Sequence, residues 1–149
     1  MVIKELYPFV QAYAFIIGLA IGSFLNVIIY RIPNNKSIVK PRSKCTGCET
    51  QISWYDNIPV LSYVLLLGKC RNCKASISVR YPLIEFICGL MTVMLLGIYG
   101  ISYEFFVIVL FCYMLIAITF IDIDHFIIPN EFIIFGLISF PAITLNLSI

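Results

Sequence analysis

The chain has 149 residues, of which 61% are hydrophobic and only 12% are charged, and its mean hydropathy is +1.00. Because about a quarter of the residues of a soluble domain are charged, this composition excludes an ordinary soluble protein and indicates an integral membrane protein. The formal net charge of +2 is small, but nine of the ten lysines and arginines lie between Arg31 and Arg80.

Four apolar segments are candidates for transmembrane helices. They extend from about Pro8 to Tyr30, from Leu83 to Ser102, from Phe105 to Ile121, and from Phe132 to the end. A hydrocarbon core of about 30 Å requires about 20 helical residues. The sequence therefore predicts an all-α polytopic membrane protein with about four transmembrane helices. The short link between the second and third segments predicts an antiparallel helical hairpin.

Two of these helices have recognisable start signals. Pro82 and Glu85 are expected to form the start and the acidic first turn of the second helix, and Asn130 and Glu131 those of the fourth. Proline fits a helix start because it has no N–H to donate, and an acidic side chain there favours the positive end of the helix dipole.

The first helix carries small and polar residues at informative spacings. Gly18 and Gly22 form a Gly-x-x-x-Gly pattern, which allows two helices to approach closely. Ser23 and Asn26 lie on the same helix, and we expect them to form interhelical hydrogen bonds rather than to act in catalysis.

The segment 31–82 connects the first two predicted helices and contains most of the basic residues. Short loops rich in lysine and arginine remain in the cytoplasm. We therefore predict that this loop is cytoplasmic and that the third helix ends on the same side of the membrane. A nucleic-acid-binding patch is a weaker interpretation, because the loop has no clustered basic run.

Four cysteines in this loop form two Cys-x-x-Cys pairs, Cys45 with Cys48 and Cys70 with Cys73, with 21 residues between the pairs. Four thiolates at about 2.3 Å complete a tetrahedral zinc shell, so the pattern predicts a closed, structural zinc site. Gly47 is expected to permit a tight turn. The basic residues expected to offset the thiolate charge are Lys44, Lys69, Arg71 and Lys74.

Two other interpretations of the cysteines are weaker. A cytoplasmic loop keeps its thiols reduced, which disfavours disulfides. A redox Cys-x-x-Cys motif normally lies beside a βαβ pattern, which this sequence lacks. The remaining cysteines, Cys88 and Cys112, lie in apolar helices and are expected to be small core residues.

The apolar stretch between the cysteine pairs is predicted to lie on the bilayer surface or against the helices. Trp54 and Tyr55 are typical of a membrane interface. The run 58–67 is too short to cross a bilayer.

The third apolar helix ends in three ionisable residues, Asp122, Asp124 and His125. Acidic residues within membrane helices are candidates for function because of their cost, although a polar end to a helix is an equally good interpretation here. Residues at i and i+2 point about 200° apart on a helix, so the two aspartates are not a catalytic pair while helical. A metal site formed by all three residues would require an unwound turn.

Several motifs together resemble one enzyme family, the type IV prepilin peptidases, which are bifunctional prepilin leader peptidase/N-methyltransferases. The resemblance extends in order along the chain. Its motifs are "GLAIGSFLNVIIYRIP" (18–33), the two cysteine pairs, "ISWYDNIPVLSYVLLLGKCRNCKASISVRYPLIE" (52–85) and "IDIDHFIIPN" (121–130).

The resemblance implies a multi-pass aspartic protease of the bacterial inner membrane. Such an enzyme cleaves the leader of type IV prepilins and pseudopilins at the cytoplasmic face. It then methylates the new N-terminus with S-adenosylmethionine. The implied partners are these substrates and membrane lipid, with no nucleic acid.

By the same resemblance, Asp122 matches the first of two catalytic aspartates, whereas Asp124 and His125 do not match that role. The second aspartate of the family belongs to a Gly-x-Gly-Asp motif, which these 149 residues lack. We therefore expect a part of a longer protein, a need for a second chain that supplies the motif, or an inactive remnant. The methyl-transfer activity is tied to the N-terminal region and its cysteine loop, with no individual residue assigned.

The expected domains are a first transmembrane helix (1–30), a zinc-binding loop (31–82) and the N-terminal part of a peptidase domain (83–149). An alternative, non-catalytic function is that of a membrane adaptor whose zinc loop binds a partner in pilus or type II secretion assembly.

Overall fold

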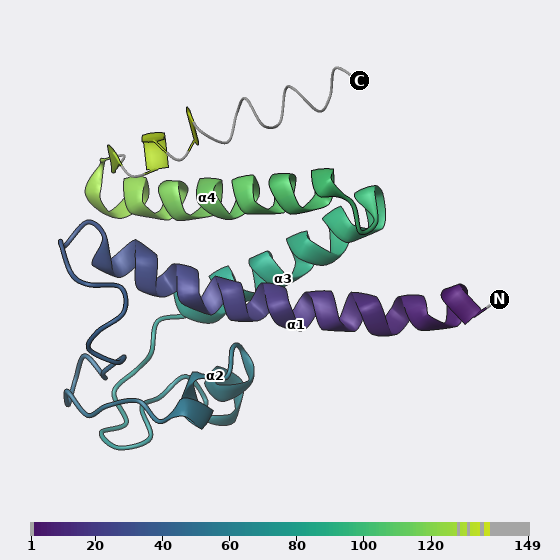
Figure 1. The fold of residues 1–149 in the computed structure, drawn as a ribbon. Helices are drawn as coiled ribbons and strands as arrows, with labels where there is room; N and C mark the ends of the chain where they lie inside the picture. The colour runs from purple at the N-terminus through teal and green to yellow at the C-terminus, as the bar shows by residue number, and fades with distance from the viewer. Residues whose placement is uncertain (1, 128, 131, 135, 138–149) are drawn as a thin grey trace.

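The computed structural model describes residues 2–127, 129–130, 132–134 and 136–137 (Figure 1). The elements, in chain order, are α1 (Val2–Arg31), the 3-10 turn η1 (Trp54–Asn57), α2 (Leu61–Leu65), α3 (Arg80–Tyr99) and α4 (Tyr103–His125). Within the described ranges the only extended pairing is two isolated bridges in the loop between α1 and α3. The all-α fold class is therefore confirmed.

Three helices are long and apolar enough to cross a membrane, namely Tyr7–Arg31, Arg80–Tyr99 and Tyr103–His125. They correspond to the first three predicted segments. Most of the fourth predicted segment, together with Glu131, lies outside the described residues. In its described part, Asn130 and residues 132–134 and 136–137 are helical.

The prediction for the start of α3 was wrong. The helix begins at Arg80, so Pro82 is its third residue and Glu85 lies in the second turn, with no acidic residue in the first. Proline is tolerated at this position because the first four N–H groups of a helix have no partner within the helix. The earlier start places Glu85 in the interior, where it is only 8% exposed.

A short turn joins α3 to α4, which confirms the predicted hairpin. Gly100 follows α3 with φ of +63°, a conformation that favours glycine. Ser102 caps α4, because its side chain accepts a hydrogen bond from the Phe105 N–H at 3.2 Å.

Helix α1 packs closely against α3, as the glycine spacing predicted (Figure 1). A Cβ atom on Gly18 would lie 2.8 Å from the Cα of Gly89, and one on Gly22 would lie 2.7 Å from the Cα of Glu85. Asn26 donates a hydrogen bond to the backbone oxygen of Tyr81 on α3 at 3.1 Å, confirming its interhelical role. The two backbones thus touch along several turns.

The most deeply buried side chains between the helices are small or branched. Ile84, Cys88, Ala117 and Ile121 are fully buried. Cys88 is therefore a core residue as predicted, whereas Cys112 is only partly buried. This core fixes α4 against α3 up to Ile121.

Gly22→Ala should lower the free energy of unfolding by about 1–3 kcal/mol, because its Cβ meets backbone that cannot move aside locally. The matched control is Gly97→Ala on α3, where the nearest atom would be 3.9 Å away. That change should be neutral or stabilising by up to about 1 kcal/mol, since alanine favours helix. Unfolding in mixed detergent measures both, and equal effects would contradict the close contact.

Candidate functional site

The four loop cysteines come together in space. The ligand atoms of Cys45, Cys48, Cys70 and Cys73 all lie within 4.8 Å of one another. The Cys45 and Cys73 sulfurs are 3.7 Å apart. A tetrahedron with metal–sulfur bonds of about 2.3 Å has edges of about 3.8 Å. The residues therefore fit a tetrahedral Cys₄ metal site of the kind the spacing predicted.

The two Cys-x-x-Cys turns have the same backbone structure. In each, the first cysteine's carbonyl accepts a hydrogen bond from the N–H four residues later, Glu49 to Cys45 at 2.9 Å and Lys74 to Cys70 at 3.1 Å. Each donor residue has positive φ, 54° at Glu49 and 61° at Lys74. The turns are closed by antiparallel bridges, Lys44 with Gln51 and Lys69 with Ser76. This repeated geometry aims both cysteine pairs at one point.

Gly47 is not required for the turn conformation. Its φ lies outside the positive range, and Asn72 occupies the equivalent place in the second turn. A side chain at Gly47 would instead meet Ala75, whose Cβ lies 3.1 Å from a Cβ built there. The glycine therefore allows one turn to pack against the other.

Hydrogen bonding makes the thiols unequal acids. The pKa of Cys48 is lowered to about 6, chiefly by hydrogen bonds from the side chain and backbone of Thr50. The backbone N–H of Cys73 is the main cause that lowers the pKa of Cys70. The Ala75 backbone lowers the pKa of Cys73, but the other thiols, Cys48 first, and burial outweigh it and raise that pKa to about 11. Thiols this close share protons, which a divalent cation would displace.

The two aspartates at the end of α4, Asp122 and Asp124, lie on a turn that stays helical and therefore do not form a pair, as predicted. Asp122 is exposed and directly follows the fully buried Ile121. The helix continues through His125 and ends where Phe126, with φ of 54°, donates its N–H to the Asp122 carbonyl at 2.8 Å. Because this turn stays helical, Asp122 and Asp124 point in different directions. In the part of the chain that the structure describes, the cysteines form the sole group of three or more potential metal ligands.

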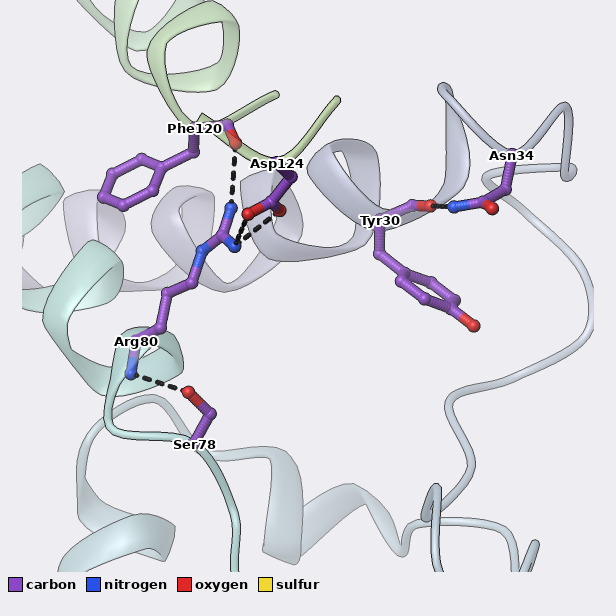
Figure 2. A network of polar contacts seen from close by, with 6 residues as sticks. All are labelled: Tyr30, Asn34, Ser78, Arg80, Phe120 and Asp124. Atoms are coloured by element: carbon purple, nitrogen blue, oxygen red, sulfur yellow. Dashed lines mark hydrogen bonds and ion pairs between the residues drawn. The ribbon is translucent and has the colours of Figure 1, made fainter. Parts of the chain in front are cut away.

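Arg80 joins the start of α3 to the end of α4 (Figure 2). Its Nη1 donates to the Asp124 carboxylate at 2.7 Å and its Nη2 to the Phe120 carbonyl at 3.1 Å. The guanidinium also lies 4.8 Å from the centre of the Phe120 ring. Asp124 is thereby committed to an ion pair, whereas Asp122, two residues away, is not. The contact holds the aspartate-bearing turn beside the end of the cysteine loop.

A cavity of about 510 Å³ lies between the loop and the helices. It is bounded by α1, both cysteine turns, η1, α2 and the start of α3. Four tyrosines line it, Tyr30, Tyr55, Tyr63 and Tyr81. Arg71, expected to offset the thiolates, instead makes a 2.7 Å ion pair with Asp56 on the cavity wall. Pockets that bind small molecules have volumes of about 300–1,000 Å³. Their walls are mostly apolar and aromatic, with a few polar groups.

Two site residues escaped the sequence analysis, Arg80 and Glu85. Glu85 is the single charged residue between Arg80 and Glu104. An isolated acid within an apolar helix is a candidate for function, and this signal could have identified it. It was assigned to a helix start instead. Nothing in the sequence pairs Arg80 with Asp124, because 44 positions separate them.

Comparison with known proteins gives a consistent result. The model of the bacterial peptidase A24 N-terminal domain matches residues 16–99, which include the second half of α1, the loop and α3. The prepilin leader peptidase/N-methyltransferase of Myxococcus xanthus is 41% identical over 94% of this chain and 42% of its own length. The enzymes of that name from Stutzerimonas stutzeri and Neisseria gonorrhoeae are each 35% identical, over 81% and 87% of this chain.

These similarities show that the chain contains the N-terminal domain of a bacterial A24 peptidase. The chain belongs to the prepilin leader peptidase/N-methyltransferase family, as its sequence motifs indicated. It spans about half the length of the curated relatives it matches, 42%, 50% and 54% of the three named above. No solved structure matches it.

The Arg80–Asp124 contact should be measurable in a double-mutant cycle. Arg80→Ala and Asp124→Ala should each destabilise the protein, and their effects should be non-additive by about 1 kcal/mol, since the pair is partly exposed. Arg80→Lys should recover part of this, because an ammonium keeps the charge but loses the planar fork. Unfolding in mixed detergent provides the free energies, and strictly additive effects would contradict the coupling.

Proposed function

We propose that the chain is the N-terminal part of an enzyme that cleaves the leaders of type IV prepilins or pseudopilins and methylates the new N-terminus. The observation that carries the proposal is that Asp122, the cysteine cluster and the cavity lie at one end of the helical bundle. The Arg80–Asp124 ion pair supports this, because it joins the end of the loop to the turn that bears Asp122.

The peptidase activity would use Asp122 as one of two catalytic aspartates. Asp122 is exposed at the end of an apolar helix, where a substrate with a membrane-embedded segment can reach it. Two carboxyl groups that share a proton can activate water and protonate the leaving amine. Since these 149 residues contain no Gly-x-Gly-Asp motif, the partner carboxylate would come from sequence outside them, in the same chain or a second one.

The methyl-transfer activity would use the 510 Å³ cavity, with S-adenosylmethionine as the methyl donor. The donor is a sulfonium cation with an aromatic base. The tyrosine-lined walls suit both features, because aromatic faces attract cations and stack on flat rings. The cavity also lies beside membrane helices, where the N-terminus of a membrane-embedded product would remain.

The cysteine cluster would hold one structural zinc ion through Cys45, Cys48, Cys70 and Cys73. Four thiolates leave no open position, so the metal would stabilise the loop and take no part in the chemistry. Both cysteine turns contribute to the cavity wall, through residues that include Cys45 and Cys70. Ordering them would shape the methyl-donor pocket.

The proposed location is the bacterial inner membrane, with the loop 31–82 and Asp122 on the cytoplasmic side. The support is the concentration of basic residues in that loop. Residues 1–30 would be the first membrane helix and 83–149 the first part of the peptidase domain. The exposed side chains of Trp54, Leu65 and Leu67 would contact lipid at the interface.

Asp122→Asn in the full-length protein should reduce the rate of leader cleavage at least about 100-fold, because an amide cannot exchange the proton. Methyl transfer to an already cleaved pilin should be unchanged. Glu104→Gln, the same loss of charge at an exposed position in the first turn of α4, is the control and should leave cleavage unchanged. Cleavage is followed by gel mobility of the prepilin. Undiminished cleavage by Asp122→Asn would refute the catalytic assignment and favour an adaptor.

The purified protein should contain one zinc ion per chain, and Cys48→Ser or Cys73→Ser should lose most of it, because three thiolates bind zinc far more weakly than four. Cys112→Ala, outside the cluster, should keep the metal. Elemental analysis gives the zinc content. A zinc-free wild-type protein, or full zinc content in Cys48→Ser, would contradict the metal site.

A further inference from the structure

The cavity contains a buried acid that the proposed chemistry does not yet use. Glu85 lies in the second turn of α3 with only 8% of its surface exposed, and it lines the cavity. Its Oε2 accepts a hydrogen bond from the Val60 N–H at 2.7 Å, and the Glu85 backbone packs against Gly22 of α1. The segment before α2 therefore holds the carboxylate in place, and α1 holds the turn that bears it.

Glu85 has no cationic partner among the residues that the structure describes. The cavity's other carboxylate, Asp56, makes a bidentate pair with Arg71, which donates to Oδ2 from Nε and to Oδ1 from Nη2. The other arginine of the wall, Arg31, donates to the backbone carbonyls of Ser37 and Pro41. Since a buried charge is costly unless it is paired, Glu85 is the carboxylate of this cavity that remains to pair with a bound cation.

We propose that Glu85 binds the ammonium group of the methyl acceptor, the newly formed N-terminus of a membrane-embedded peptide. This inference rests on the proposed methyltransferase function and assigns its acceptor subsite. An ammonium donates up to three hydrogen bonds, and a fixed carboxylate beside aromatic side chains is suited to it. One carboxylate alone offers too few oxygens for a divalent metal ion.

The position of Glu85 favours the acceptor over the methyl donor. Glu85 belongs to a membrane-spanning helix and lies against Gly22 of α1, a second such helix. A soluble donor would enter from the loop, whereas the acceptor's N-terminus is attached to an apolar helix and cannot leave the membrane boundary. The acceptor amine is also released at Asp122, and Arg80, five residues before Glu85 on α3, contacts that turn of α4.

The decisive experiment compares binding of two peptides by the full-length protein in detergent. Each is an apolar segment of about twenty residues, long enough to span the micelle. One has a free N-terminal amine and the other is N-acetylated. The wild-type protein should prefer the free amine at least about tenfold, the value of one charge-assisted hydrogen bond. Fluorescence anisotropy of labelled peptides gives the dissociation constants without any methyl transfer.

Glu85→Gln should abolish this preference, because the amide oxygen can still accept from Val60 while the negative charge is lost. The matched control is Glu104→Gln, the same change at an exposed position in the first turn of α4. It should keep the preference. In turnover, Glu85→Gln should raise KM for the acceptor peptide and leave the dissociation constant of S-adenosylmethionine unchanged.

Three results would overturn the assignment. The first is equal binding of both peptides by the wild-type protein. The second is an undiminished preference in Glu85→Gln. The third is weaker S-adenosylmethionine binding in that variant with the peptide preference intact, which would assign Glu85 to the donor. Failure of the wild-type protein to methylate would contradict the proposed function alone, because the peptide preference is measured without turnover.

Discussion

At Gly18, Gly22 and Gly89 the backbones of α1 and α3 meet with no side chain between them, and the rest of the structure depends on this contact. Without a hydrophobic driving force between helices in lipid, close backbone packing and hydrogen bonds hold them together. The approach brings Asn26 within reach of the Tyr81 carbonyl. The close approach of the two helices also buries Glu85, whose Cα lies directly against Gly22.

The same contact determines where the loop goes. The end of α1 and the start of α3 are held side by side, so the intervening segment must fold back over them (Figure 1). Within that segment each cysteine turn is closed by a backbone hydrogen bond and an antiparallel bridge. The space left between the turns and the helices is the tyrosine-lined cavity. A membrane domain with few helices thus obtains a pocket outside its helical core.

The acidic residues at this end of the bundle have different surroundings, which separates their possible roles. Asp56 and Asp124 are each paired with an arginine, Arg71 and Arg80. Asp122 is exposed, and Glu85 is buried without a cation among the described residues. An acid neutralised by a fixed arginine is structural, whereas an unpaired one remains available to a substrate. Asp122 and Glu85 are the two of these acids to which the proposed chemistries assign a role.

Apolar length, cysteine spacing and glycine spacing determined most of what the sequence could predict by itself: three membrane helices, the four-cysteine cluster and the close α1–α3 contact. These features depend on residues that are near in sequence or chemically unmistakable. The tertiary structure alone decided that Arg80 meets Asp124, that Glu85 is an interior residue and that a cavity separates the loop from the helices. The reason is that such relations join positions tens of residues apart, and helix packing, rather than any local pattern, sets which of them touch.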